Sequence, residues 1–426
     1  MTVGGRRHRE LLADIGLFVL PSLATVALYL PSGVLMPFRL VTFGLVALAV
    51  VRIAACERTV DRVIIALGGL AAIVGVFGLV GWLRYGIGPG AVDDAVRVAL
   101  LLSLAIAVAI LATPRSVVWL LAGWCAAAAL AIPVALWEIA SGDHLPKNLY
   151  KLDAPSFDWN PIASWFDNPN LLAYQCALIL LVLPLAISVL PRWASWLALP
   201  AAVIIAFVLL ATNGRLALLG VFVAVLLWLA RSKWGWLGIG VGVAGFAALV
   251  AAGFAPARRL WLLTLQVIST FDPNGDPRDA ARLSLAKSGW WIAQQTQFLG
   301  TGPGGFSTWS IRPDNPYKWN QLNNAHSGLV EILSEYGIVA AALTLAALTL
   351  VVVYGWRSAR IEPRGTPAIA AFVAVTLAAT WVVLSACHST WLRQPLSAMH
   401  IATIVVLISA FSWRGRAASK PVPAAP

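Results

Sequence analysis

Long apolar runs separated by short polar connections dominate the chain. About twelve runs reach the length of roughly 20 residues that an α-helix needs to cross a bilayer. They fall at 11–30, 38–55, 63–83, 93–112, 116–140, 171–190, 194–213, 215–231, 234–254, 327–354, 367–387 and 396–413. Because 60% of the 426 residues are hydrophobic and only 11% are charged, the chain lacks the polar surface that a soluble multidomain protein needs. We therefore expect an all-α polytopic integral membrane protein.

The basic residues predict how these helices are oriented, because short cytoplasmic loops carry an excess of Lys and Arg. With a cytoplasmic N-terminus, the short connections on the opposite side hold five basic residues. These are Arg39, Arg84, Arg97, Arg215 and Arg393. The distribution favours both termini in the cytoplasm. The same bias, together with attraction to anionic lipids, explains most of the net charge of +12, so we expect membrane lipids and no nucleic acid as partners.

Two long connections interrupt the pattern, and both face outward in this topology. The expected organisation is a first set of helices, an outer loop, a second set of helices, a large outer loop, a third set of helices and a cytoplasmic tail. The corresponding ranges are 1–140, 141–170, 171–254, 255–326, 327–413 and 414–426.

The large outer loop carries most of the polar chemistry. Arg258 and Arg259 open it, and a helix is expected from Arg278 to Phe298. Positions four apart share a helix face, so Arg278 and Arg282 lie together. Leu283 and Trp290 share another face, so the helix is amphipathic and is expected on or near the membrane surface.

A glycine-rich run, Leu299-Gly-Thr-Gly-Pro-Gly-Gly305, follows that helix. Its glycines, among them Gly302 and Gly304, permit tight turns and close approach of the backbone to a ligand or a neighbouring element. No Gly-Lys-Ser/Thr sequence follows, so this is not a nucleotide-binding P-loop.

His326 is the candidate general base. It stands with Ser327 at the start of the tenth apolar run, and imidazole can take a proton from a hydroxyl near neutral pH. Glu331 and Glu335 follow in the apolar run, where ionisable groups are costly and default to a functional or paired role. Both point away from His326 on an ideal helix, so we do not expect a direct Glu–His dyad.

Further cations are expected at the same outer boundary. Arg215 caps a short helical hairpin, and its planar guanidinium suits phosphate oxygens. His388 and Arg393 lie at the outer end of the eleventh run and are weaker candidates. Asp93 and Arg97 are four apart and are expected to form a structural pair.

The four cysteines, Cys56, Cys125, Cys176 and Cys387, show no metal-ligand or redox spacing. No pattern of acidic or histidine residues indicates a divalent-metal site. We therefore expect a metal-independent mechanism without a cofactor.

Four segments in order resemble the O-antigen ligase and O-antigen polymerase superfamily. His326-Ser327 followed by Gly337 resembles its His-Asn/Ser/Gln-x9-Gly motif. The segment Phe166-Asp-Asn-Pro-Asn170 resembles its Phe-x-Asn-Pro-Asn segment, and Thr212-Asn-Gly-Arg215 resembles its Thr-x-Ser-Arg-Gly junction. The fourth is Arg282 with the run from Phe298 to Phe306. The resemblance covers about residues 160–345.

Two departures concern the choice of subfamily. Asn213-Gly214 replaces the usual Ser before Arg215, and Ala340 stands where the family often has Gly. Neither departure removes a charged group.

The resemblance implies a GT-C-type glycosyltransferase in the bacterial inner membrane with a periplasmic active site. It implies a glycan donor linked to undecaprenyl diphosphate and, for a ligase, the lipid A–core of lipopolysaccharide as acceptor. His326 would take the acceptor proton in an inverting displacement, and Arg215 and Arg282 would bind the diphosphate. Arg258, Arg259 and Arg278 are further diphosphate candidates. Possible supporting residues are Asn170, Gly302, Gly304, Ser327, Glu331, His388 and Arg393.

Alternatives remain open at this point. An O-antigen polymerase extends another carrier-linked glycan, and a protein O-oligosaccharyltransferase of the same superfamily glycosylates proteins. The compact length and the single dominant long loop favour the ligase. A transporter or flippase would instead show charges near the centres of its spans and broken helices in both halves.

Overall fold

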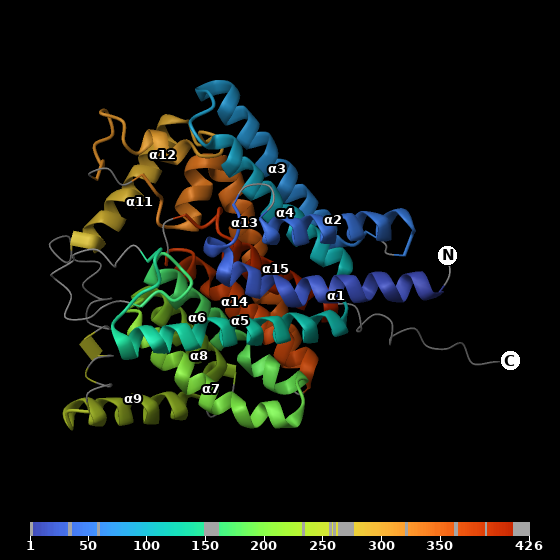
Figure 1. The fold of residues 1–426 in the computed structure, drawn as a ribbon. Helices are drawn as coiled ribbons and strands as arrows, with labels where there is room; N and C mark the ends of the chain where they lie inside the picture. The colour runs from blue at the N-terminus through green and yellow to red at the C-terminus, as the bar shows by residue number, and fades with distance from the viewer. Residues whose placement is uncertain are drawn as a thin grey trace.

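The computed structural model describes residues 3–32, 36–57, 60–148, 162–231, 235–254, 258, 261–262, 277–319, 323–361, 365–387 and 390–411. Within these ranges the secondary structure is entirely helical (Figure 1). The elements are α1 (Val3–Val26), η1 (Ala27–Tyr29), α2 (Pro37–Ala54), α3 (Arg62–Tyr85), α4 (Ala91–Leu111), α5 (Pro114–Ser141), α6 (Pro169–Val189), α7 (Arg192–Ala211), α8 (Arg215–Arg231), α9 (Gly235–Ala251), α11 (Pro277–Gln295), α12 (Gly305–Trp309), α13 (Gly328–Ile361), α14 (Thr366–Leu384) and α15 (Pro395–Phe411).

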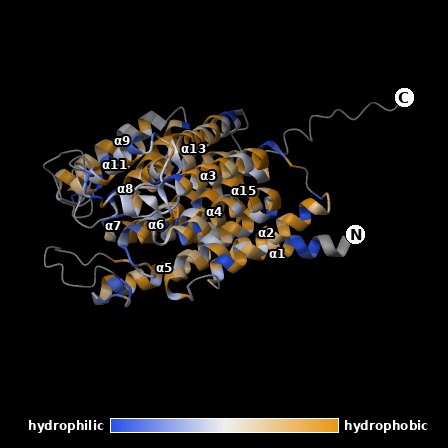
Figure 2. Ribbon diagram, turned by 90° about the horizontal axis from the view of Figure 1, so that it is seen from above, coloured by the Kyte–Doolittle hydropathy of each residue, from blue (hydrophilic) through white to orange (hydrophobic). Residues whose placement is uncertain are grey.

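Each of the twelve predicted apolar runs coincides with one of these helices. Eight described helices are long and apolar enough to cross a membrane. Three shorter apolar helices accompany them, Ser195–Ala211, Gly240–Ala251 and Pro395–Phe411, and α8 has 17 residues. The helical class of a multi-pass membrane protein is therefore supported, whereas the number of twelve spans stays a prediction. Figure 2 shows hydrophobic residues along most of the helices, with hydrophilic residues gathered toward the ends of the bundle.

Several helices begin where the sequence provides a cap. The side chain of Asp61 accepts hydrogen bonds from the first turn of α3. Thr113 and Asn168 cap α5 and α6 in the same way, and each precedes a proline at the first helical position. Such caps satisfy N–H groups that the first turn leaves without helical partners, and proline lacks the N–H there.

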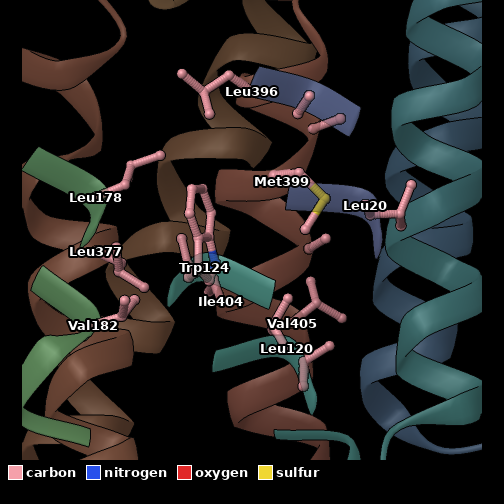
Figure 3. Close-up of a cluster of buried hydrophobic side chains, with 14 of the residues drawn as sticks. Leu20, Leu120, Trp124, Leu178, Val182, Leu377, Leu396, Met399, Ile404 and Val405 are labelled. Carbon is pink, nitrogen blue, oxygen red and sulfur yellow. The ribbon is translucent and has the colours of Figure 1, made fainter. Parts of the chain in front are cut away.

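The core of the bundle surrounds α15. Figure 3 shows Met399, Ile404 and Val405 of α15 among side chains from α1, α5, α6 and α14. Trp124 is 1% exposed and its indole N–H donates to the Thr403 hydroxyl over 3.1 Å, which satisfies the one polar group of the ring. The first and last described helices, α1 and α15, are thus packed into one body.

The segment between α9 and α13 contributes α11 and α12, which lie at the end of the bundle opposite the start of α1 (Figures 1 and 2). The helix predicted from Arg278 to Phe298 is α11, which ends earlier, at Gln295. It buries Leu285 and Ile292 toward α13 and leaves Leu283 and Trp290 exposed. The apolar face predicted to lie near the membrane is therefore the exposed face.

Candidate active site

His326 lies directly before α13, outside the apolar helix. Its backbone is left-handed, with φ of 50°, which is uncommon for a residue with a side chain. Among the described residues its ring Nδ1 has no hydrogen-bond partner although the atom is buried. Burial first, and then the charge of Arg282, lower the pKa of His326 to about 4. The imidazole is therefore neutral at pH 7 and has a lone pair to accept a proton.

The charge of Arg282 in α11 contributes to the lowered pKa of His326, which indicates that its guanidinium lies near the imidazole. The structure thus brings together the two candidates that the sequence places in different parts of the chain, the base and one cation of the long loop.

The glycine-rich run positions this arrangement by binding to a break in α13. Gly337 has φ of 80° and ψ of 177°, a conformation that is essentially restricted to glycine. The break leaves the carbonyls of Ser334 and Glu335 without helical partners. They accept hydrogen bonds from Thr301 N–H over 2.9 Å and Gly302 N–H over 2.8 Å.

The contact is reciprocal, since Ile338 N–H after the break donates to the Phe298 carbonyl over 2.9 Å. A Cβ at Gly337 would lie 2.5 Å from that carbonyl oxygen, so the close approach also requires glycine. Trp82 of α3 donates from its indole to the Pro303 carbonyl on the other side of the run. We call this unit, residues 298–306 bound at the Gly337 break, the glycine clasp.

A buried cluster of charged side chains lies next to the glycine clasp and is hydrogen-bonded to it. The Arg393 guanidinium lies 3.2 Å from Asp94, 3.5 Å from Glu331 and 3.2 Å from Glu335. Glu331 also accepts from Leu392 N–H over 3.0 Å, and Glu335 accepts from Phe306 N–H over 3.3 Å. Both glutamates are thus paired, which is one of the two roles expected for them. Arg393 is paired with three carboxylates, so its charge is already compensated and it is not available to bind the diphosphate of a glycan donor.

The turn between α7 and α8 fixes the start of α8, where Arg215 lies. Thr212 accepts from Gly214 N–H, and Asn213 has φ of 57°. Gly214 packs directly against Ala173 of α6.

A short path of contacts connects this turn with the His326 region. Beside Ala173, the Tyr174 hydroxyl accepts from the Trp391 indole over 3.3 Å. The Trp391 ring packs on Gly328, two residues after His326. Arg215 therefore lies at the same end of the bundle as His326.

The remaining predicted residues are placed as follows. Asn170 lies in the first turn of α6 and donates its backbone N–H to Asn168. The Ser327 hydroxyl accepts from Val330 N–H over 3.5 Å at the start of α13, and Gly304 packs against Ala91 and Asp94. Arg258 is exposed, and the backbone of Arg278 is part of α11. Arg259 and His388 lie outside the described residues.

Two features were not predicted. The ion pair of Asp93 with Arg97 is confirmed, but Asp93 also binds Arg39 of α2 over 3.1 Å. The only signal in the sequence was the isolated position of Arg39 at the outer end of its run. The packing of Trp391 on Gly328 was also missed, because nothing in a local pattern links residues so distant in the chain.

Among the described residues, no three His, Cys, Asp or Glu side chains form a group that could hold a metal ion. What the site offers is a neutral imidazole, a nearby guanidinium and a rigid backbone clasp at the end of a helical bundle. This set suits proton transfer from a hydroxyl beside a developing negative charge.

Comparison with known proteins bears on this arrangement. Residues 200–345 match the family model described as O-antigen ligase, and the matched region contains Arg215, Arg282, the glycine clasp and His326. A search of curated proteins finds no match to the chain. The family match confirms the resemblance to the ligase and polymerase superfamily and supports a glycosyltransferase-like enzyme. Three of the four motifs lie inside the matched residues, whereas the segment from Phe166 to Asn170 lies outside them. Over residues 200–345 the chain is therefore similar to the O-antigen ligase family.

Proposed function

We propose that this protein is an O-antigen ligase that transfers a glycan from undecaprenyl diphosphate to a hydroxyl of lipid A–core. The transfer takes place at the periplasmic face of a bacterial inner membrane, with both termini of the chain in the cytoplasm. The single observation that carries the proposal is the position of a buried, neutral His326 near the cation Arg282 at one end of the bundle. A neutral base with a cation nearby is what a hydroxyl nucleophile and a diphosphate leaving group need.

In the proposed reaction, the acceptor oxygen attacks the anomeric carbon of the donor sugar from the face opposite the diphosphate. The new carbon–oxygen bond forms as the bond between the anomeric carbon and the diphosphate oxygen breaks. The electron pair of the broken bond leaves with the diphosphate. His326 takes the proton of the acceptor hydroxyl, and Arg282 stabilises the negative charge that develops on the leaving group. The anomeric configuration is inverted.

Binding of the donor would raise the pKa of the general base, His326. In the free protein the charge of Arg282 contributes to the low pKa of His326. A bound diphosphate would neutralise that charge, so the pKa would rise from about 4 toward the working pH. General-base catalysis is most effective when the pKa of the base lies near the working pH.

Arg215 is the second proposed diphosphate ligand, because it lies at the same end of the bundle on a turn held by Thr212. Arg258, Arg259 and Arg278 are proposed as further contacts to the donor. The mechanism uses no metal ion or cofactor, and the assignment to the GT-C class stays a prediction.

A transfer assay with alternative acceptors tests this function. Purified full-length protein in liposomes is supplied with glycan on undecaprenyl diphosphate and with lipid A–core, a second carrier-linked glycan or an acceptor protein. We expect covalent transfer to lipid A–core at a rate well above the other two. Transfer to the carrier-linked glycan would instead show a polymerase, and transfer to protein an oligosaccharyltransferase. Movement of the donor across the bilayer without a covalent product would show a flippase.

A further inference from the structure

A second group of arginines surrounds a cavity of about 300 Å³ beside the candidate active site. The cavity lies where η1 ends and where α2, α4, α6 and α15 begin. Arg39, Arg97 and Arg393 line it, which are three of the five arginines of the short outer connections. Phe166 and Leu171, from the segment around Asn170, form part of its mainly apolar wall.

The arginines line the cavity, whereas the carboxylates that form ion pairs with them do not. Asp93 binds Arg39, whose residue is only 8% exposed, and Asp93 also binds Arg97. Asp94, Glu331 and Glu335 bind Arg393. None of these four carboxylates is among the lining residues; Asp167 is the one lining carboxyl, and burial raises its pKa.

Arg97 keeps hydrogen-bond donors for a further ligand. A guanidinium has five N–H groups in a fixed fork, and the carboxylates engage only some of them. Arg97 pairs with Asp93 through one terminal nitrogen of its guanidinium, and 39% of its side chain is exposed. Its remaining N–H groups can donate to an anionic oxygen in the cavity.

The lining also indicates the rest of the ligand. Guanidinium groups at one side match phosphate oxygens, and the apolar wall of leucine and aromatic side chains matches a hydrocarbon chain. A volume of about 300 Å³ suits a head group rather than a whole lipid. The cavity therefore fits the head group of a phosphate-bearing lipid with its chains in the bilayer.

One loop separates this cavity from His326. Leu392 lines the cavity and donates its N–H to Glu331, while the neighbouring Trp391 packs on Gly328 beside His326. A transfer between two lipids needs two adjacent sites, and the proposed donor ligands Arg215 and Arg282 are not among the lining residues. We propose that the cavity binds the phosphate-bearing acceptor lipid, an inference that rests on the proposed function.

Two variants and one control test the acceptor site in the full-length protein. Arg97→Gln removes a phosphate ligand, and Ala27→Phe fills the cavity from η1. Arg312→Gln removes an exposed arginine of the outer segment that pairs with Asp314, so it controls for the loss of charge. Thermal unfolding in detergent verifies that each variant is folded.

Binding is measured by native mass spectrometry with diphosphorylated lipid A, its dephosphorylated form, undecaprenyl diphosphate and phosphatidylglycerol. We expect both cavity variants to bind lipid A about tenfold more weakly, the loss expected for one charge-assisted hydrogen bond or a filled site. Binding of undecaprenyl diphosphate should be unchanged. In the parent protein, dephosphorylated lipid A should bind more weakly than lipid A.

Three outcomes would overturn the inference: unchanged lipid A binding in folded cavity variants, an equal loss for phosphatidylglycerol, or a selective loss for undecaprenyl diphosphate. The binding readout is independent of catalysis. If the protein binds lipid A through the cavity but transfers no glycan, the proposed function fails and the lipid site stands. If transfer occurs and the cavity variants keep the acceptor KM, the cavity assignment alone fails.

Discussion

His326 combines a strained backbone with a ring whose Nδ1 atom has no partner among the described residues. Both features cost free energy. Strained residues and unsatisfied buried polar groups concentrate at functional sites. At the scale of single residues, this combination with a neighbouring Arg282 is the strongest sign of catalysis.

The pH dependence of the reaction should respond to Arg282. Burial and the positive charge of Arg282 both disfavour the charged imidazole, so Arg282→Gln removes the smaller cause of the lowered pKa. The pKa of His326 should rise from about 4 but stay below 6.5, since burial remains. The acid limb of kcat/KM should therefore move to higher pH, and NMR of labelled histidine in the free protein should show the same shift. Arg312→Gln is the matched control, and an acid limb that stays in place in Arg282→Gln would contradict the pairing.

At the scale of residues, the sequence predicted which side chains carry the chemistry, but not which side chains contact them. His326 and Arg282 could be named from residue type and position, and the pairing of Glu331 and Glu335 followed from the cost of charge in an apolar helix. That Arg393 is their partner could not be predicted. The contact joins the start of α13 to a loop more than fifty residues later, and only the packing of the bundle decides it.

At the scale of elements, the glycine clasp links the long outer segment to α13. The break in α13 exposes two backbone carbonyls, and the glycine-rich turn supplies the two N–H groups that donate hydrogen bonds to them. Neither segment is therefore left with these backbone groups buried and unpaired. Both glycine motifs are visible in the sequence, but the hydrogen bonds between them join backbone segments that are distant in the chain. Periodicity and capping rules describe only local structure, so they cannot predict this contact.

Substitution of the glycine at the break should weaken the clasp. Gly337→Ala places a side chain in a region of backbone space that is essentially restricted to glycine, and its Cβ would lie 2.5 Å from the Phe298 carbonyl. We expect a loss of about 1–3 kcal/mol in the free energy of unfolding. Thermal or chemical unfolding in detergent measures it.

Gly44→Ala is the matched control, because a Cβ at that exposed position of α2 meets nothing within 4 Å. Equal stability of Gly337→Ala and the parent protein would show that the break does not depend on glycine.

At the scale of the whole molecule, one end of the bundle holds the clasp, the ion cluster, the arginine-lined cavity and His326. The hydrophobic faces of the helices lie between this end and the start of α1 (Figure 2). The apolar runs predicted this scaffold well because every run is locally encoded by its length and composition. The sequence did not predict the gathering of the outer arginines around one cavity, since that depends on which helices are neighbours.

The orientation of the molecule can be tested with single cysteines. In a background without the four native cysteines, Asp314→Cys should react with a membrane-impermeant maleimide added to spheroplasts. His8→Cys should react only after the membrane is permeabilised. Both positions are exposed in the structure, so their difference reports the side of the membrane. The reverse pattern would contradict a periplasmic active site.

The most direct test of the central claim is single-turnover glycan transfer by His326→Ala in liposomes. If His326 takes the acceptor proton, the rate should fall by about 10²–10⁴-fold while the donor still binds. His8→Ala, at the opposite end of the bundle, should transfer at the parental rate. A folded, inserted His326→Ala protein that transfers glycan as fast as the parent would contradict the mechanism.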